Sequence, residues 1–292
     1  MRARRICVLF SLPVLLAAVG CAPTNVTHSG HPPQASTSAA ANVCAPKNLP
    51  LQTAGQLTIA TDSPAYPPWF VHNDPTNGKG YESAVAYAVA HQLGFSNGQV
   101  TWVKEPFNNS YAPGPKDFDF DINQISITAE RAKVVDFSDG YYSAAQGVIA
   151  LKDSPVAEAT SVADLADYKL GAQTGTTSLT AIRDVIQPEE DPLVFQDTNA
   201  AKQALQNGQV DAILADVPTA FYITAVEIPQ GQIVGQFQPE TGQQEEFGML
   251  FQKGSGLVPC VNKALATLRS DGTLAALEKK WVSDVANVPV LK

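Results

Sequence analysis

Apolar segments of strand length alternate with segments of helical periodicity along most of the chain. A strand is predicted at 57–61, and a helix at 81–93, where Val85, Val89 and Leu93 fall on one side. Further strands and helices are predicted at 100–103, 118–127, 169–173, 193–196, 199–207 and 210–215. Repeated strand–helix units are typical of an α/β fold with parallel sheets, whose ligand clefts open at the carboxyl ends of the strands.

The first apolar segment follows a basic head and is too short for a membrane span. Residues 1–5 contain three arginines, and residues 6–20 carry no charge. This pattern is typical of a secretory signal peptide, because a spanning helix needs about 20 apolar residues. The segment ends in Ala18-Val19-Gly20-Cys21, which resembles the lipobox of bacterial lipoproteins. The resemblance implies cleavage after residue 20 and lipidation of Cys21, and ordinary cleavage to a free secreted protein is the alternative.

The segment 21–43 is predicted to be a tether between the lipid and the folded part of the chain. After Cys21 it contains no Asp, Glu, Lys, Arg or aromatic residue and is rich in Pro, Ser, Thr and Ala. Such a composition cannot build a core and favours a flexible linker. We therefore expect an extracytoplasmic protein that is held at the outer face of the cell membrane through Cys21.

Composition and charge exclude several classes of protein. Hydrophobic residues make up 45% of the 292 residues and charged residues 16%, which is the balance of a globular protein. The formal net charge of −9, with no long basic run, argues against nucleic acid as a partner.

Two cysteines remain once the signal peptide is removed and Cys21 is lipidated. Cys44 and Cys260 form an even pair in a chain predicted to be exported, which favours a disulfide. The bridge would tie the start of the folded part to a segment near its end. Two unrelated buried thiols are the alternative.

Two polar segments after predicted strands are suited to binding an anion. Ser126 lies at the end of the first of these strands and Arg131 follows it, and the guanidinium fork of arginine pairs bidentately with a carboxylate. A surface ion pair is the alternative for a single arginine. Gly175-Thr176-Thr177 precede a predicted helix, whose first N–H groups attract anions, although threonine there can also be an ordinary N-cap.

Five segments in order resemble the amino-acid-binding proteins of ABC importers, which have the type II periplasmic-binding fold. They are TDSPAYPPW at 61–69, SITAERAKVVDFSD at 126–139, GTTS at 175–178, NGQVDA at 207–212 and SDGTL at 270–274. The resemblance extends over residues 57–281. It implies a two-lobed α/β fold with a hinge of two crossing strands and a central ligand cleft.

The resemblance also implies how a free amino acid would be held. Arg131 and Ser126 of one lobe would bind the α-carboxylate, together with Thr177 and Thr176 of the other lobe. Asp216 would receive the α-ammonium group, and capping of the following helix is the alternative for this residue. Because a zwitterion needs one fixed cation and one fixed anion, leaving either charge unpaired in a closed cleft is costly.

The part of the site that would contact the ligand side chain departs from the family. Tyr66 and Trp69 lie in a proline-rich turn and are predicted to form an aromatic wall, with burial in the core as the alternative. Asn123 and Gln124 stand where the family has apolar or small residues, which favours a polar ligand side chain. A buried hydrogen-bond network is the alternative for these two residues.

The lobes are predicted from the same resemblance. Lobe 1 would comprise 54–146 and 247–292, and lobe 2 would comprise 147–246, with the crossings near 144–148 and 245–249. The predicted function is capture of a polar L-amino acid by lobe closure and its delivery to a membrane ABC permease, with the protein as a monomer. A sensor lipoprotein that presents its closed form to a membrane signalling protein is the alternative.

The sequence shows no pattern typical of an enzyme, a metal site or a cofactor site. The segment 117–121 begins like a calcium loop, but Ile122 and Thr128 occupy the positions that require glycine and glutamate. Phosphate-binding, dinucleotide-binding and nucleophile-elbow motifs are not found. We therefore predict a binding protein without catalytic residues, metal or cofactor, and keep a cleft-based lyase as a third hypothesis.

Overall fold

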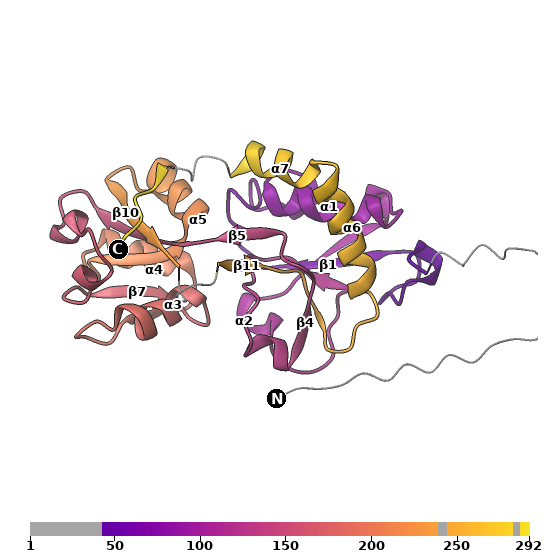
Figure 1. Ribbon diagram of the computed structural model, residues 1–292, viewed down its shortest axis with the longest axis horizontal. Coiled ribbons are helices and arrows are strands. Elements are labelled where there is room, and N and C mark those ends of the chain that lie inside the picture. Colours follow the sequence, from indigo (N-terminus) through magenta and orange to yellow (C-terminus); the bar gives the residue numbers. More distant parts are fainter. Residues whose placement is uncertain (1–42, 239–243, 283–286) are drawn as a thin grey trace, which may run out of the picture. The chain divides into compact units, whose positions relative to one another are not determined.

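A computed structural model describes residues 43–238, 244–282 and 287–292 (Figure 1). The predicted signal peptide, Cys21 and nearly all of the predicted tether lie outside the described residues. Within the described residues the chain forms two five-stranded sheets and one two-stranded sheet. No helix in this part of the chain combines the length and the hydropathy that crossing a membrane requires.

The first sheet has the strand order β2-β1-β3-β12-β4. Its strands are β1 (Leu57–Thr61), β2 (Val100–Lys104), β3 (Phe120–Asp121), β4 (Val135–Phe137) and β12 (Leu250–Gln252). β1 pairs in parallel with β2 and β3, whereas β12 is antiparallel to β3 and β4. The sheet is therefore mixed, because β12 belongs to the returning C-terminal part of the chain and runs antiparallel to its neighbours.

The second sheet has the order β10-β6-β9-β7-β8. Its strands are β6 (Gln146–Leu151), β7 (Leu170–Gln173), β8 (Leu193–Phe195), β9 (Ala212–Asp216) and β10 (Gly231–Phe237). β7 runs parallel to β8 and β9, and β6 runs antiparallel to β9 and β10. Alternate side chains of β6 enter different cores, since Val148 packs in one cluster and Ile149 in another.

Two short strands join the two sheets. β5 (Tyr142–Ala144) and β11 (Glu245–Phe247) pair antiparallel and lie between the first and second sheets (Figure 1). The chain passes from the first sheet to the second through β5 and returns through β11.

Seven α-helices flank the sheets within the described residues. They are α1 (Tyr81–Gln92), α2 (Phe107–Ser110), α3 (Thr177–Ala181), α4 (Thr198–Gln206), α5 (Val217–Tyr222), α6 (Val258–Ser270) and α7 (Thr273–Trp281). α3 and α5 each continue into a wider π-type turn, which ends at Ile186 and Glu227 respectively. We call the first sheet with α1, α2, α6 and α7 lobe 1, and the second sheet with α3, α4 and α5 lobe 2.

The described structure differs from the sequence prediction in three places. The strand predicted at 118–127 is reduced to Phe120–Asp121, since Gln124 has a φ of 47° and leaves the extended conformation. The segment 106–115, where no helix was predicted, contains the four-residue helix α2. The last residues do not stay with lobe 1 as predicted, because Leu291 is buried in the core of lobe 2 and Val290 forms a bridge with Gln236 of β10.

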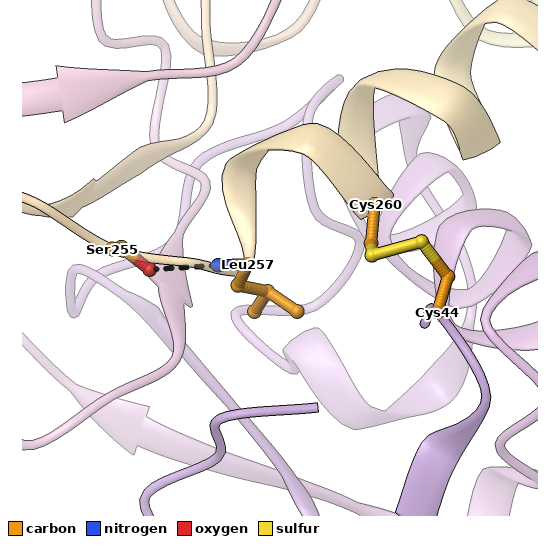
Figure 2. Close-up of a disulfide and its surroundings, with 4 residues drawn as sticks. All are labelled: Cys44, Ser255, Leu257 and Cys260. Atoms are coloured by element: carbon orange, nitrogen blue, oxygen red, sulfur yellow. Dashed lines mark hydrogen bonds between the residues drawn. A yellow bond between two sulfur atoms is a disulfide. The ribbon is translucent and has the colours of Figure 1, made fainter. Parts of the chain in front are cut away.

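Cys44 and Cys260 form a disulfide, as predicted (Figure 2). The two residues are 216 positions apart in the sequence. Cys260 lies in the first turns of α6, and its backbone N–H donates to the carbonyl of Leu257 at the start of that helix. The bridge therefore fixes the first described residues to a helix that packs on the core of lobe 1.

Candidate ligand-binding site

A cavity of about 60 Å³ lies between the lobes, at the carboxyl ends of strands from both sheets. The predicted residues that line it are Tyr66, Asn123, Gln124, Ser126, Thr176, Thr177 and Asp216. The loops after β1 and β3 supply the lobe 1 residues, and the turn from β7 into α3 and the last residue of β9 supply those of lobe 2. This arrangement follows from the parallel pairing of β1 with β3 and of β7 with β9, which brings each pair of carboxyl ends to one edge.

Arg131 lines an adjoining recess of about 410 Å³ and does not line the smaller cavity. The two spaces share Ser126, Thr176 and Thr177 as common walls. Arg131 and Asp216 therefore lie on neighbouring parts of one cleft, and the hydroxyl residues that were predicted to bind the carboxylate with Arg131 line both parts.

Arg131 is 8% exposed and is held by backbone carbonyls and aromatic rings. Its Nη1 donates to the Ser126 carbonyl at 2.8 Å, and its Nη2 donates to the Gly175 carbonyl of lobe 2 at 2.9 Å. Burial lowers the pKa of the guanidinium, and the nearby Tyr111, Glu245 and Asp216 oppose that shift. None of the ion pairs among the described residues includes Arg131, so the alternative of a structural ion pair has no support here.

The threonines after β7 combine capping with access to the cleft. The hydroxyl of Thr176 accepts the backbone N–H of Leu179 at 3.1 Å and caps α3. The hydroxyl of Thr177 lies 3.3 Å from that of Ser126, across the cleft. Capping by Thr176 and presentation of Thr177 to the cavity are thus compatible.

Asp216 belongs to a network of polar side chains that reaches the crossing strands. Gln146, at the start of β6, donates to Asp216 Oδ1 at 3.4 Å and to Glu245 Oε2 of β11 at 2.7 Å. Glu245 also accepts the hydroxyl of Ser126. Burial, together with the negative charge of Glu245, raises the pKa of Asp216 well above its usual range. A cationic group in the cavity would relieve this cost, because an opposite charge favours the ionised carboxylate.

Gln124 occupies the left-handed backbone region and is fixed by a buried glutamate. Glu82, in the first turn of α1, accepts the backbone N–H and the side-chain amide of Gln124 and also the hydroxyl of Tyr141. Burial raises the pKa of Glu82 to about 7, against the lowering effect of these hydrogen bonds. Gln124 thus takes part in a buried hydrogen-bond network and also lines the cavity, so both interpretations of this residue hold geometrically.

The structure separates the two predicted aromatic residues. Tyr66 lines the cavity, and its ring lies 5.5 Å from Lys202 Nζ of lobe 2. Trp69 is fully buried in the core of lobe 1, and its ring packs edge-on against Tyr81, Tyr142 and Phe247. The prediction that Trp69 forms a wall of the site is corrected accordingly: the proline-rich turn points Tyr66 outward and Trp69 into the core.

Sequence reasoning did not select Asp62 and Phe107, which also line the cavity. The carboxylate of Asp62 accepts the backbone N–H groups of Ser63 at 2.6 Å and Phe107 at 3.2 Å, and it forms no ion pair within the described residues. Asp62 directly follows β1, and its place at the carboxyl end of a strand was a signal that could have identified it. Phe107 had no such signal, because α2 was not predicted.

The described residues contain no group of three or more His, Cys, Asp or Glu side chains placed to hold a metal ion. The cavity is instead lined by hydroxyls, amides, aromatic rings and two aspartates. Such a lining can orient a small polar ligand with both donors and acceptors.

Comparisons with known proteins identify the class to which this fold and site belong. Residues 57–284 match the bacterial extracellular solute-binding proteins, family 3, and the chain belongs to that family. The ABC transporter glutamine-binding protein GlnH of Bacillus subtilis is 31% identical over 217 residues, which cover 72% of this chain and 76% of GlnH. The L-cystine-binding protein TcyJ of Escherichia coli is 30% identical over 230 residues, covering 78% of this chain and 82% of TcyJ.

The solved structures agree on the fold. An ancestral arginine-binding protein bound to glutamine superposes with a TM-score of 0.66 and 31% identity, over 78% of this chain and 98% of that protein. The family match begins at residue 57, after the predicted signal peptide and tether.

Proposed function

We propose that the protein captures a polar L-amino acid between its lobes and delivers it to the membrane permease of an ABC importer. The observation that carries this proposal is the placement of Arg131 and Asp216 on neighbouring parts of one cleft, with Ser126 and Thr177 between them. The relatives support it, since GlnH and TcyJ are named as amino-acid-binding proteins.

The charges of the cleft are complementary to a zwitterion. The guanidinium of Arg131 and the hydroxyls of Ser126 and Thr177 suit a carboxylate, and the carboxylate of Asp216 suits an ammonium group. Lobe 1 supplies Arg131 and Ser126, whereas lobe 2 supplies Thr177 and Asp216. A ligand that contacts all four stabilises the closed arrangement over an open one, because only closure satisfies both of its charges.

The remaining lining of the cavity favours a ligand side chain that donates hydrogen bonds. The carboxylate of Asp62 is an acceptor without a cationic partner among the described residues, and Tyr66 and Phe107 line the same space. Arginine, lysine, histidine and glutamine carry such donors, whereas glutamate does not. GlnH is named as a glutamine-binding protein, and the solved ancestral arginine-binding protein is bound to glutamine.

The N-terminal segment adds a proposed mode of attachment. Lipidation of Cys21 would anchor the protein to the outer face of the membrane, and the uncharged segment that follows would let the folded part reach the permease as a monomer. Replacement of Cys21 by Ser should release the protein from the membrane fraction without altering ligand affinity. Equal membrane retention of the C21S variant would refute lipidation as the anchor.

Identification of the ligand tests the proposal. The ligand released by denaturation of the purified protein is analysed by mass spectrometry, and the twenty amino acids and cystine are titrated in a calorimeter. We expect one or a few polar amino acids to bind with a Kd near micromolar, about −8 kcal/mol. Absence of heat with every compound would refute the proposal. The Asp62→Asn variant should weaken a cationic ligand more than a neutral one, which separates arginine-type from glutamine-type recognition.

No chemical step is part of the proposal. Incubation with the identified ligand should return it unchanged, and turnover would instead favour the lyase hypothesis. A sensor role uses the same cleft, and only the membrane protein that recognises the closed form distinguishes the two.

A further inference from the structure

The segment around α2 reaches across the cleft and contacts lobe 2. α2 belongs to lobe 1, because Phe107 packs in a cluster with Ala60 and Ile125 of that lobe. The hydroxyl of Tyr111, just after α2, donates to Asn108 Oδ1 at 2.9 Å. A Cβ atom placed on Gly175 of lobe 2 would overlap both the Tyr111 hydroxyl oxygen and Asn108 Oδ1. These two side chains therefore rest directly on the Gly175 backbone.

The same tyrosine also contacts Arg131. The guanidinium carbon of Arg131 lies 4.8 Å from the centre of the Tyr111 ring and 5.5 Å from that of Phe107. Arg131 Nη2 in turn donates to the carbonyl of Gly175. Tyr111, Arg131 and Gly175 thus form a three-way contact in which each residue touches the other two.

This contact constrains the orientation of the Arg131 guanidinium, which no ion pair among the described residues fixes. A guanidinium group is planar, and its use as a carboxylate fork depends on its orientation as well as on its position. Two backbone carbonyls accept from Arg131, and the aromatic rings cover its face, so the plane is set by lobe 1 and by Gly175 together.

We propose that Tyr111 is a positioning residue that orients Arg131 for the ligand carboxylate, and that its contact with Gly175 couples this orientation to lobe closure. The proposal rests on the proposed function of the cleft. Gly175 must be glycine here, because any side chain would displace Tyr111 from its place beside Arg131. Gly175 of lobe 2 contacts Tyr111 and Arg131 only when the lobes meet. The guanidinium of Arg131 therefore takes the orientation that suits a carboxylate in the closed form.

A pair of glycine variants isolates this contact. Gly175 has a φ of 73° and Gly208 a φ of 67°, so alanine is strained to a similar extent at both, but Gly208 has no atom within 4 Å of the added Cβ. With L-arginine and L-glutamine as probes, Gly175→Ala should raise the Kd about tenfold or more, and Gly208→Ala should leave it within about twofold. In an Asn108→Ala/Tyr111→Ala background, where the obstructing atoms are gone, Gly175→Ala should cost no more than Gly208→Ala.

Variants of Tyr111 test whether this residue orients Arg131 or only fills space. Tyr111→Phe keeps the ring beside Arg131 and should keep the Kd within about threefold, whereas Tyr111→Ala should raise it about tenfold. Tyr111→Ala should weaken L-argininamide, which lacks the carboxylate, by about twofold at most. A merely structural role of Tyr111 would weaken both probes equally.

Each outcome bears on a defined claim. Equal affinities of the Gly175→Ala and Gly208→Ala variants, or a Gly175→Ala loss that persists in the double-alanine background, would overturn the contact as a coupling device. Equal weakening of L-arginine and L-argininamide by Tyr111→Ala would overturn the positioning role. A wild-type protein that binds none of the amino acids would instead refute the proposed function on which the proposal rests.

Discussion

The indole Nε1 of Trp69 donates to the hydroxyl of Thr219 at 2.8 Å, and this hydrogen bond joins the core of lobe 1 to the first turn of α5 in lobe 2. Trp69 has 0% exposure and packs against three aromatic rings, so it cannot move to follow its partner. Thr219 is three residues after Asp216 and lines the same cavity. The bond therefore forms beside the proposed ammonium site and depends on how the lobes meet.

Replacement of Thr219 by Val should weaken ligand binding without weakening the unliganded fold. Valine keeps the shape of threonine but cannot accept from Trp69, and a buried N–H without a partner costs about 1–3 kcal/mol. We expect the Kd to rise about tenfold, as measured by calorimetry. Thr224→Val is the matched control, because the Thr224 hydroxyl donates within its own helix. Equal effects of the two variants would show that the cross-lobe bond does not contribute to closure.

Replacement of Arg131 by Lys should abolish most of the affinity although the positive charge remains. A lysine ammonium has no planar fork, cannot reach the Ser126 and Gly175 carbonyls together, and presents a point charge to the ligand. We expect a rise in Kd of about a hundredfold or more, with a small change in the melting temperature of the unliganded protein. Arg183→Lys, at an exposed position of lobe 2, is the control. A large loss of unliganded stability with unchanged affinity would assign Arg131 to the fold and not to the ligand.

Asp121 should make the fold less stable as the pH rises. It is fully buried, accepts the hydroxyl of Ser110 on one oxygen, and has no partner for the other among the described residues. Burial raises its pKa to about 8 from 3.8, so the folded state favours the protonated form. Its contribution to stability is complete below pH 3.8 and is lost as the pH rises through about 8.

The Asp121→Asn variant tests this pH dependence. Between pH 6 and pH 9 the free energy of unfolding of the wild type should fall by about 2 kcal/mol more than that of the variant, as measured by urea unfolding. A smaller decline should remain in the variant, because Glu82 has a pKa of about 7 for the same reason of burial. Asp117→Asn, at an exposed position three residues before β3, should keep the wild-type slope. Parallel pH profiles for wild type and D121N would contradict the account of Asp121.

The sequence predicted those parts of the site that depend on strand order and on single residue types. Ser126, Thr177 and Asp216 lie at or just beyond the carboxyl ends of strands whose apolar runs were recognisable, and the parallel pairing of neighbouring strands then determines which edge they reach. Trp69 could not be assigned in this way. It lies in a turn with several prolines, where the side chains follow neither the helical nor the strand period. Its burial is decided by the aromatic residues of α1 and β5 that surround it.

The residues that α2 contributes to the cavity could not be predicted either, for a similar reason. Four helical residues between Pro106 and Pro115 are too few to give a periodic pattern. The helix is held by side-chain contacts that give no periodic pattern, including the bond from Ser110 to Asp121 and the donation of Lys116 Nζ to the carbonyls of Asn109 and Ala112. The cavity residue Phe107 and the contacts of Tyr111 become visible only with these interactions.

Removal of the disulfide should destabilise the fold and leave the site intact. Cys44 and Cys260 are 216 positions apart, and a bridge that closes a loop of that length restricts the unfolded chain by about 5 kcal/mol in the chain-entropy account. The Cys44→Ala/Cys260→Ala variant should therefore unfold at lower urea concentration while its ligand Kd stays within about twofold. Unchanged unfolding of the variant would show that the bridge does not stabilise the fold, and a large change in Kd would place Cys44 or Cys260 in communication with the cleft.

A crystal structure with the amino acid identified by titration tests the central claim most directly. The account predicts that the ligand carboxylate accepts from Arg131 and Ser126 and that its ammonium group donates to Asp216, with both lobes in contact with one molecule. A ligand held by one lobe alone, or one whose ammonium and carboxylate groups contact neither Asp216 nor Arg131, would contradict it.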